Sequence, residues 1–299
     1  MDIVKVNLGK RTYSIIIGYG IFKQLGSYLK KINIGTDAFI ITNSFLKRKY
    51  GRRLAQILTK SGFDCHFKLV ADSERSKSIE TASSVIKELA KFDQKRKVFV
   101  IAFGGGVIGD LAGFVASVYK RGISYVQIPT TLLAQVDSAI GGKTAVDLDL
   151  GKNLVGAFYQ PKLVFSDVGF LKSLDTIQMR CGMAEVIKYA IIKDQKFFNF
   201  LENKYRQVKK QDPVVLQKIV YACSRIKAGI VARDEKETLG LRSILNFGHT
   251  IGHAIEAAGG YKGYSHGQAV GLGMLAAVDL SHKLGLVDSR PALCIENLI

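Results

Sequence analysis

The sequence has few cysteines and no long apolar run. Its four cysteines, Cys65, Cys181, Cys223 and Cys294, are widely spaced and form no CxxC pair, which argues against a disulfide framework and against a cysteine-based zinc site. The first residues lack the apolar segment of a secretory signal, and the longest apolar stretch, 269–278, is far shorter than the roughly 20 residues that span a bilayer. We therefore expect a cytoplasmic protein with no membrane partner.

Acidic residues are also scarce. Lys and Arg total 43 against 25 Asp and Glu, and the net charge of +18 favours an anionic partner, either nucleic acid or an anionic metabolite. The densest basic run, 47–53, is accompanied by no zinc-finger spacing, RNP signature or basic zipper. We interpret this run as a solvated helix face, which makes a small anionic molecule the expected partner and disfavours nucleic acid.

Short β-branched runs alternate with helical patterns as far as about residue 167. Runs such as DAFIITN, KVFVIAF and YVQIP predict strands, and their alternation with helices is typical of an α/β domain with a mainly parallel, Rossmann-like sheet. After Gly169, amphipathic helical patterns cover 180–193, 212–232, 246–258 and 267–284. The sequence thus predicts an α/β domain over residues 1–170, an all-helical domain over 171–299, and a ligand cleft at their junction.

A glycine-rich turn follows the buried strand pattern at 98–103. Gly104, Gly105 and Gly106 lead into another helical pattern, so the order is strand, glycine turn and helix N-terminus. This arrangement lets a pyrophosphate approach the backbone and meet free N–H groups at the positive end of the helix. The acidic residue expected about 20 positions later is missing. The turn alone therefore leaves two readings open, a dinucleotide site and a tight structural turn.

A second glycine pair precedes Lys143 and resembles the end of a Walker A loop. Asp137 holds the position of that loop's first glycine, and no strand pattern leads into the segment, which disfavours ATP hydrolysis. A flexible loop with Lys143, followed by Lys152 and Asn153, could instead grip a phosphate. The alternative is a surface lysine with no ligand.

Three of the five histidines, His249, His253 and His266, lie within residues 249–266. In a helix that begins at Asn246, the side chains of Asn246, His249 and His253 share one face. Two histidines four residues apart, with a third nearby, favour a metal site over a buried histidine that is merely hydrogen-bonded. HTIGH lacks the glutamate of HExxH peptidases, so peptidase chemistry is disfavoured.

Glu185 and Lys188 lie three residues apart in the apolar segment GMAEVIKYAII. They could form an intrahelical ion pair, which is worth a few tenths of a kcal/mol at a surface. The apolar neighbours of Glu185 argue against a surface position for this residue. A carboxylate added to two histidines would complete a metal site that keeps one position open for substrate.

Several segments, in their order along the chain, together resemble one known family. They are GGGVIGDLAGFVAS (104–117), YKRG (119–122), IPTTLLAQVDSAIGGKTAVD (128–147), GKNLVGAFYQP (151–161), GMAEVIKYAII (182–192), LRSILNFGHTIGHAIEA (241–257) and HGQAVGLGM (266–274). Over nearly all its length the chain resembles the 3-dehydroquinate synthases, which are sugar phosphate cyclases of the shikimate pathway. The resemblance implies an NAD-binding α/β domain, an all-α domain and a homodimer.

The resemblance also implies the reaction. Members of the family are carbon–oxygen lyases that convert 3-deoxy-D-arabino-heptulosonate 7-phosphate to 3-dehydroquinate and phosphate. NAD oxidises a hydroxyl transiently, phosphate is eliminated, the hydride returns, and an intramolecular aldol step closes the carbocycle. A divalent metal, zinc or cobalt, holds adjacent hydroxyls.

The family pattern assigns residues of this sequence to each ligand. The metal is implied at Glu185, His249 and His266. NAD is implied at Asn43, Glu74, Lys77, Gly104, Gly105, Gly106, Asp110, Thr130, Thr131, Lys143 and Lys152. Substrate contacts are implied at Lys143, Lys152, Asn153, Lys227, Arg242 and, from the partner subunit, Arg121. Catalytic contacts are implied at Asp137, Lys143, Lys188, Asn246 and His253.

Three departures from the family pattern qualify this resemblance. Family members continue beyond position 299 with more helix and a phosphate-binding lysine, so we expect a C-terminally truncated helical domain. Gln268 replaces the glutamate of HGE, and one residue is inserted in ETLGLR, between Lys227 and Arg242. The alternatives are a sibling cyclase, an NAD- and metal-dependent alcohol dehydrogenase, and an inactive, truncated binding protein.

Overall fold

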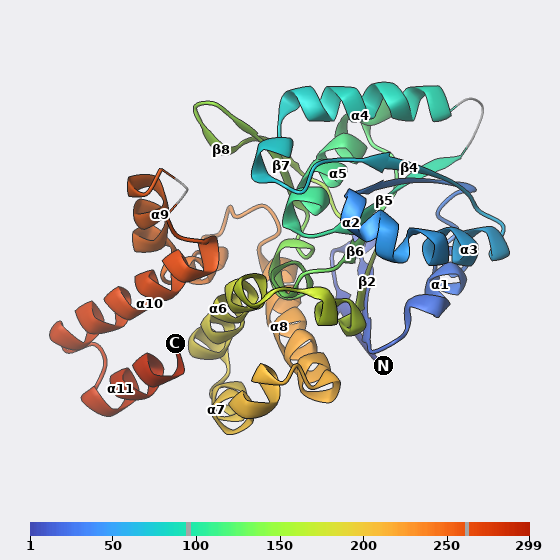
Figure 1. The fold of residues 1–299 in the computed structure, drawn as a ribbon. Helices are drawn as coiled ribbons and strands as arrows, with labels where there is room; N and C mark the ends of the chain where they lie inside the picture. The colour runs from blue at the N-terminus through green and yellow to red at the C-terminus, as the bar shows by residue number, and fades with distance from the viewer. Residues whose placement is uncertain (94–96, 261–262) are drawn as a thin grey trace.

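The computed structural model describes residues 1–93, 97–260 and 263–299. Figure 1 shows a sheet with helices on its faces in the N-terminal part of the chain, and a group of helices that forms the C-terminal part. The N-terminal edge strands contact the helical part, because α8 (Pro213–Arg233) packs against β1 (Asp2–Val6) and β2 (Tyr13–Gly18).

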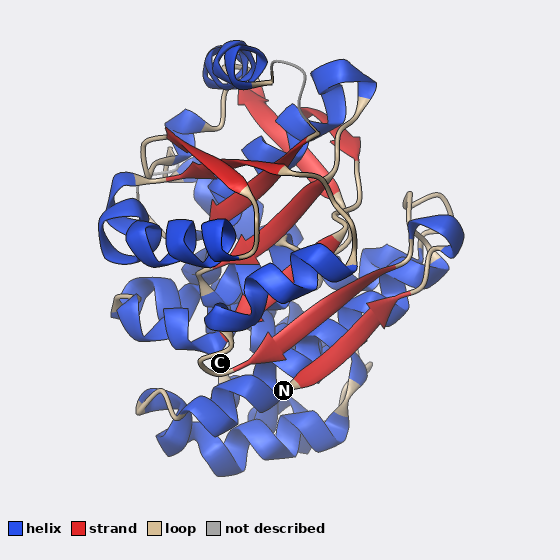
Figure 2. Cartoon of the chain, turned by 90° about the vertical axis from the view of Figure 1, so that its right-hand side faces the viewer, coloured by secondary structure: helices blue, strands red, loops and turns tan. Residues whose placement is uncertain are grey.

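The main sheet has seven strands in the order β1-β2-β9-β6-β5-β3-β4. Its strands are β1 (Asp2–Val6), β2 (Tyr13–Gly18), β3 (Asp37–Thr42), β4 (Asp64–Leu69), β5 (Val98–Gly104), β6 (Tyr125–Pro129) and β9 (Leu163–Asp167). Only β1 and β2 pair antiparallel, at the edge that carries the N-terminus (Figure 2). Every other pair is parallel, for example β3 and β5 with Ile40 opposite Ile101. The predicted mainly parallel α/β sheet is confirmed.

Both faces of the sheet are buried by helices. In β3, Ala38 and Ile40 face one apolar core with α1 (Leu25–Lys31) and α3 (Arg52–Lys60), while Phe39 and Ile41 face the other. The second core includes α4 (Ile79–Phe92) and α5 (Gly106–Val118). Alternate residues of a strand point to opposite faces, so a strand covered on both sides is apolar throughout.

The C-terminal part is helical, as predicted. Its long helices are α6 (Thr176–Lys193), α7 (Gln195–Lys209), α8 (Pro213–Arg233), α9 (His249–Ala258), α10 (His266–Lys283) and α11 (Ser289–Leu298). Asp175, Asp194 and Asp212 cap the first three, each accepting hydrogen bonds from free backbone N–H groups. Neither α7 nor α11 was singled out by the sequence patterns.

Short helices complete the description. They are η1 (Gly9–Arg11), η2 (Phe22–Gln24), α2 (Ser44–Leu46), η3 (Lys47–Gly51), η4 (Glu74–Ser76), η5 (Tyr119–Arg121), η6 (Ala134–Ser138), η7 (Val168–Ser173) and η8 (Leu241–Asn246). Among the described residues, no helix combines the length and the apolar character that crossing a membrane requires.

A third apolar core joins the two parts of the chain. It contains Ile15 and Ile17 of β2 together with Val186 of α6 and Val220 of α8. The strands at this edge thus bury one face against helices of the C-terminal part. The division of the chain at residue 170 stays a prediction.

A hairpin replaces the flexible loop that we predicted around Lys143. Strands β7 (Lys143–Leu148) and β8 (Gly151–Phe158) pair antiparallel, and Lys143 is opposite Phe158. Gly113 of α5 lies so close to Thr144 of β7 that an added Cβ would come within 2.4 Å of the threonine methyl carbon. This close packing against α5 orders the hairpin, and a search for apolar runs does not detect it.

The helix predicted to begin at Asn246 begins later. Asn246 ends η8, Gly248 has a φ of 77°, and α9 starts at His249. A Cβ on Gly248 would come within 2.5 Å of the side chain of Met274 in α10. The left-handed glycine and this close contact break the helix, so Asn246 does not share a helical face with His249 and His253.

Candidate active site

Two adjoining pockets lie between the sheet and the helical part. The first, of about 620 Å³, is lined by the glycine turn and by Glu74, Lys77, His253 and His266, among others. The second, of about 510 Å³, is lined by Lys143 and Lys227, among others. The walls that both pockets share consist of Asp110, Asp137, Ser138 and Asn153. The shared walls allow two ligands to meet.

The glycine turn brings backbone close to the first pocket. Gly105 precedes the first turn of α5, whose free N–H groups carry the positive end of the helix dipole. A Cβ on Gly105 would come within 3.0 Å of the Thr131 methyl carbon, and one on Gly106 within 3.2 Å of Ser138 Oγ. Thr130 N donates to Gly104 O at 3.0 Å and fixes the turn. This cradle of glycines can bind a pyrophosphate, because it presents backbone N–H groups at positions where side chains would block the ligand.

A partly buried charge cluster borders the glycine turn. Lys77 Nζ lies 2.5 Å from Asp110 Oδ2 and also donates to Asn153 Oδ1. Burial raises the pKa of Asp110 to about 6, against the opposing effect of the Lys77 charge. Burial works against the ammonium of Lys77, but the charge of Asp110 raises the pKa of Lys77 overall. This cluster ties the glycine turn to the hairpin that carries Asn153.

Three of the residues implied for NAD, namely Asn43, Glu74 and Lys77, divide into two groups. Glu74 and Lys77 line the first pocket. Asn43 is buried at the end of β3, where its Oδ1 accepts a hydrogen bond from Leu46 N at 2.8 Å and caps α2. Asn43 does not belong to the described walls of either pocket.

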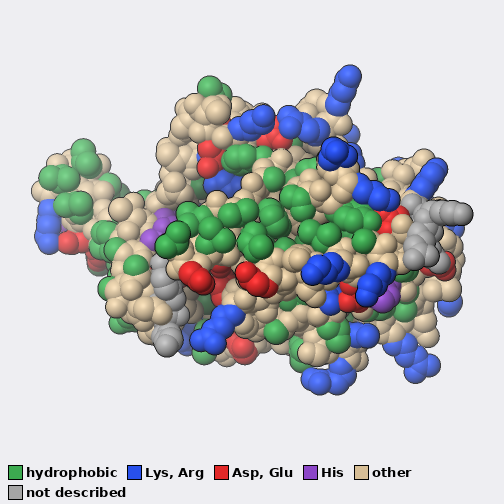
Figure 3. Space-filling view, turned by 90° about the horizontal axis from the view of Figure 1, so that it is seen from above, with side chains coloured by type: hydrophobic (Ala, Val, Ile, Leu, Met, Phe, Trp, Pro, Cys, Tyr) green, Lys and Arg blue, Asp and Glu red, His purple; other side chains and the backbone are tan. Residues whose placement is uncertain are grey.

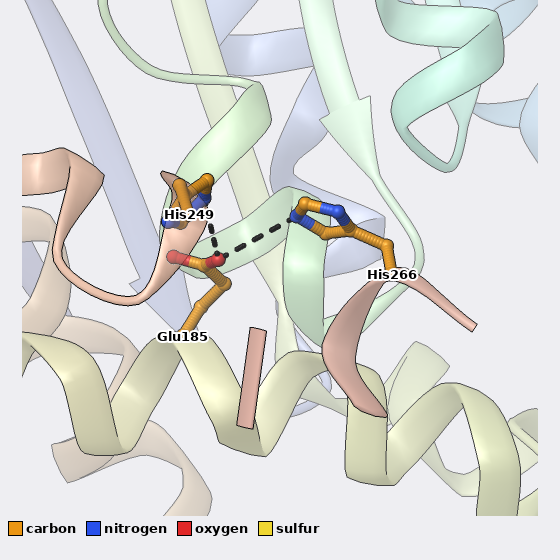
Figure 4. Close-up of side chains that lie close together, drawn as sticks. All are labelled: Glu185, His249 and His266. Atoms are coloured by element: carbon orange, nitrogen blue, oxygen red, sulfur yellow. Dashed lines mark ion pairs between the residues drawn. The ribbon is translucent and has the colours of Figure 1, made fainter. Parts of the chain in front are cut away.

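Glu185, His249 and His266 converge on one point (Figure 4). Glu185 Oε1 lies 3.4 Å from His249 Nε2 and 3.7 Å from His266 Nε2, and Glu185 is only 1% exposed. Within the described chain, Glu185 Oε1 accepts no hydrogen bond. A buried carboxylate oxygen that faces two imidazole nitrogens at these separations fits a divalent metal placed among them.

The surroundings of this group favour the metal-binding protonation states of two of its donors, Glu185 and His249. Burial lowers the pKa of His249, and its Nδ1 lies 3.2 Å from Phe247 O, which leaves Nε2 for a metal. Burial alone would raise the pKa of Glu185, but the adjacent His266 ring and the Lys188 ammonium lower it overall. Lys188 lies against the other oxygen of Glu185 and is itself 2% exposed.

His253 belongs to a second group, with Glu256 and His266. His266 Nδ1 lies 3.1 Å from Glu256 Oε2, and Lys152 Nζ lies 3.8 Å from Glu256 Oε1. The exposed His253 ring lies 5.3 Å from that of His249, centroid to centroid. Glu256 is a site residue that the sequence analysis missed, although its spacing of three from His253 on one helix could have indicated it.

Asp137 is a point of contact between η6 and two helices of the C-terminal part. Its Oδ1 accepts hydrogen bonds from Tyr189 Oη and from Lys227 Nζ, the latter at 2.7 Å. Burial opposes ionisation, but the charges of Lys227 and Lys188 hold the pKa of Asp137 well below its usual range. The predicted catalytic residues Asp137 and Lys188 are thus near the metal group, whereas Asn246 is exposed on η8, outside the described pocket walls.

The predicted anion-binding residues lie in four places. Lys143 and Asn153 line the second pocket with Lys227, and Lys152 lines the first. Arg242 is 3% exposed, and its Nη1 donates to Glu235 O at 2.9 Å. Arg121 lies apart, exposed on the η5 turn with a φ of 64°.

Basic side chains are also present on the surface. In the view of Figure 3, Lys and Arg are dispersed over the face, with acidic side chains between them. A nucleic-acid interface would gather them in a patch or stripe. The excess of positive charge on this face is better suited to general attraction of small anions.

Comparison with known proteins identifies the family. The model for the 3-dehydroquinate synthase N-terminal region matches residues 67–181, and the model for the C-terminal region matches 182–299. The chain is 46% identical over 299 residues to a 3-dehydroquinate synthase of Thermodesulfovibrio yellowstonii, covering 100% of this chain and 83% of that protein.

Solved structures of related enzymes share the fold. A 2-deoxy-scyllo-inosose synthase complexed with carbaglucose-6-phosphate, NAD⁺ and Co²⁺ matches with a TM-score of 0.91 and 27% identity, over 99% of this chain and 81% of that one. A 2-epi-5-epi-valiolone synthase from Streptomyces hygroscopicus subsp. jinggangensis, with NAD⁺ and Zn²⁺ bound, matches with a TM-score of 0.85 and 27% identity, over 96% and 79%. On the evidence of the family models and the 46% identical relative, this chain belongs to the 3-dehydroquinate synthase family.

Proposed function

We propose that the chain is a cytoplasmic lyase that converts 3-deoxy-D-arabino-heptulosonate 7-phosphate to 3-dehydroquinate and phosphate, using NAD and a divalent metal. The observation that carries this proposal is the position of Asp137. Asp137 lines both pockets, the first together with the glycine turn and His266, and the second together with Lys143 and Lys227, whose ammonium lies 2.7 Å from the Asp137 carboxylate.

The first pocket would hold NAD. Gly104, Gly105 and Gly106 would bind the pyrophosphate through backbone N–H groups, with Thr130, Thr131 and Asp110 around them and Asn43, Glu74 and Lys77 farther along the dinucleotide. When bound, NAD supplies a hydride acceptor that is regenerated in each turnover. The solved relatives with NAD⁺ bound support this cofactor.

Glu185, His249 and His266 would hold the metal. When bound, a zinc or cobalt ion supplies a Lewis acid that acidifies a substrate hydroxyl. Lys188 and Asp137 would orient the substrate hydroxyls, as would Asn246 after a movement of η8. His253, which is exposed and lines the first pocket, would contact the substrate.

The second pocket would hold the anionic ends of the substrate. Lys143 and Asn153, together with Lys152 from the adjoining first pocket, would bind the phosphate, where charge-assisted hydrogen bonds are strong. Lys227 and Arg242 would bind the carboxylate. These cations would hold the flexible polyanion in one geometry. They would also stabilise the negative charge that develops on the phosphate as it leaves.

A homodimer would add Arg121 of one subunit to the phosphate site of the other. Arg121 is exposed, and the adjacent Gly122 packs on Tyr159, one residue after β8. That hairpin exposes Leu150 and Leu154, at 90% and 59%, an apolar surface that a second subunit could cover. Mixing the inactive variants Arg121→Ala and Lys143→Met should restore about a quarter of the activity, since half of randomly formed dimers carry one intact site. No restoration would place Arg121 outside the partner's site.

The reaction is tested by supplying the purified chain with NAD, zinc and the sugar acid phosphate, and by identifying the product by mass spectrometry. We expect 3-dehydroquinate and an equal amount of phosphate. Glucose 6-phosphate, which has no carboxylate for Lys227 and Arg242, serves as the comparison substrate. Preferential turnover of glucose 6-phosphate would indicate a sibling cyclase, and accumulation of NADH a dehydrogenase.

A further inference from the structure

The turn that carries Arg121 has a strained backbone. η5 places two consecutive residues with a Cβ in the left-handed region, Lys120 with a φ of 48° and Arg121 with a φ of 64°. Residues other than glycine avoid this region, because the Cβ comes too close to the following carbonyl oxygen. Such a conformation persists only where surrounding contacts hold it. The turn therefore needs an anchor on each side of Arg121.

The anchor that follows Arg121 is formed by α5 and by the residue after β8. Ile123 N donates to Ala116 O at 2.9 Å, which ties the chain back to α5. Tyr159 Oη donates to Ile123 O, also at 2.9 Å. Both hydrogen-bonding groups of the Ile123 backbone are thus paired, and the chain beyond the turn is fixed.

Asp93 provides the anchor that precedes Arg121. It is the residue directly after α4, and its side chain is only 3% exposed. Asp93 Oδ2 accepts a hydrogen bond from Tyr119 Oη at 3.0 Å and lies 2.6 Å from Lys120 Nζ. Burial and the bond to Asp93 raise the pKa of Tyr119 to about 12, so its hydroxyl stays protonated and donates. One carboxylate oxygen therefore holds the two residues that come just before Arg121.

The position of Asp93 gives no benefit to its own helix. A negative charge at the C-terminal end of a helix is disfavoured by the helix dipole, so α4 alone would be better served by a neutral or basic residue. Asp93 also does not belong to the described walls of either pocket. Its contacts with Tyr119 and Lys120 are what offset the unfavourable position, and they act on the turn of Arg121.

We propose that Asp93 is a positioning residue for Arg121. By holding Tyr119 and Lys120, it fixes the direction in which the Arg121 side chain leaves the turn. Asp93 thereby acts on the substrate site of the partner subunit and not on the site of its own subunit. Without Asp93, Lys120 can return to a negative φ, which moves Arg121 away from the phosphate. This inference rests on the proposed role of Arg121 in the partner's phosphate site.

Turnover of the sugar acid phosphate by the homodimeric variants measures the size of the effect. Asp93→Ala should lower kcat/KM by about 10-fold, since even a small displacement of a substrate-binding group is costly. Tyr119→Phe removes the same hydrogen bond from the other side and should lower kcat/KM about 2- to 5-fold, because the Lys120 contact stays. Glu88→Ala is the matched control. It removes an acid of the same helix that pairs with Lys68, away from the turn, and should leave kcat/KM unchanged.

Heterodimers with two different affinity tags show which site Asp93 serves. Asp93→Ala and the inactive Lys143→Met are placed either in different subunits or together in one subunit opposite a wild-type subunit. In different subunits, one site has Lys143 and receives a correctly held Arg121, so kcat/KM should be about half that of the wild type. In one subunit, the remaining site with Lys143 receives a misplaced Arg121, so kcat/KM should be about one twentieth. A merely structural defect in the Asp93→Ala subunit would give the opposite order.

The opposite order, or a wild-type kcat/KM in the Asp93→Ala homodimer, would overturn the inference. The heterodimer of Arg121→Ala with Lys143→Met tests the proposed function separately. About half of the wild-type activity in that heterodimer keeps Arg121 in the partner's site even if Asp93 fails its test. No activity there removes Arg121 from the partner's site, and the inference falls with it. Near-ultraviolet circular dichroism verifies folding, and Tyr119→Phe takes the place of Asp93→Ala in the same pairs if Asp93→Ala does not fold.

Discussion

Lys227 and Asp137 form a nearly buried ion pair that joins α8 to η6. Lys227 Nζ lies 2.7 Å from Asp137 Oδ1 and 2.9 Å from the backbone oxygen of Asp137. The Lys227 side chain is 7% exposed and that of Asp137 is 26% exposed. Loss of either partner leaves the other charge poorly solvated, so this pair affects stability as well as the site.

Lys227→Met should destabilise the protein by about 2 kcal/mol, somewhat less than for a fully buried pair because Asp137 keeps some solvent contact. The measurement is urea unfolding at pH 7. Arg225→Met, on the same helix, removes an exposed partner of Asp194 and should cost no more than about 0.5 kcal/mol. Equal effects of the two substitutions would contradict the importance of the Asp137 contact.

Glu256→Gln should weaken zinc binding by roughly 10- to 100-fold, because Glu256 orients His266 through Nδ1 while Nε2 faces Glu185. Competition with a chelating dye measures the affinity without any need for turnover. Glu202→Gln, which removes an exposed acid on α7, should leave zinc affinity unchanged. Wild-type affinity in Glu256→Gln would mean that His266 needs no such support.

Gly105→Ala should weaken NAD binding by about 10-fold, because the added methyl group crowds Thr131 and obstructs the approach of a pyrophosphate to the backbone. Fluorescence titration measures this affinity. Gly229→Ala, at an exposed position of α8 with open space around it, should stabilise the protein by about 0.5 to 1 kcal/mol and leave NAD binding unchanged. Unaltered NAD affinity in Gly105→Ala would argue against the cradle.

Because of Asp110, the free energy of unfolding should increase as the pH falls from 7 to 4. Burial raises the pKa of its carboxyl from 3.8 to about 6, so the folded state binds the proton more tightly than the unfolded state does. This contribution is fully present below pH 3.8 and is lost as the pH rises through 6. The stability of wild type relative to Asp110→Asn should therefore increase by on the order of 2 kcal/mol from pH 7 to pH 4.

Urea unfolding of both proteins at several pH values checks this prediction. Asp110→Asn also leaves Lys77 without its ionic partner. Because Lys77 stays charged from pH 7 to pH 4, this loss changes the free energy of unfolding by the same amount at each pH and does not alter the pH dependence. A difference that is flat, or that decreases toward pH 4, would mean that Lys77 keeps Asp110 ionised.

Much of the architecture could be predicted from the sequence because it depends on apolar periodicity. The strand at DAFIITN is buried on both faces and reads as a continuous apolar run, so β3 was predicted. The hairpin of β7 and β8 was not, since its strands carry exposed polar residues such as Lys152 and depend on contact with α5 for order. The break before α9 depends on Gly248 and its contact with Met274, which no local pattern contains.

The site residues, like the fold, divide into those that the sequence patterns indicated and those that they did not. Clustering in the sequence indicated His249 and His266, and an acid in an apolar segment indicated Glu185. The family resemblance was needed to separate His253 from the proposed ligands. Glu237 was not indicated by the sequence patterns, because its contacts with Lys143 and Arg242 arise only in the folded chain.

The central claim is tested most directly by following phosphate and NADH together during turnover of 3-deoxy-D-arabino-heptulosonate 7-phosphate. With NAD and zinc present, the wild type should release phosphate over many turnovers without net accumulation of NADH. Omission of either cofactor, or Glu185→Ala, should abolish release. NADH that rises in step with product, or phosphate release that is indifferent to NAD and zinc, would contradict the account.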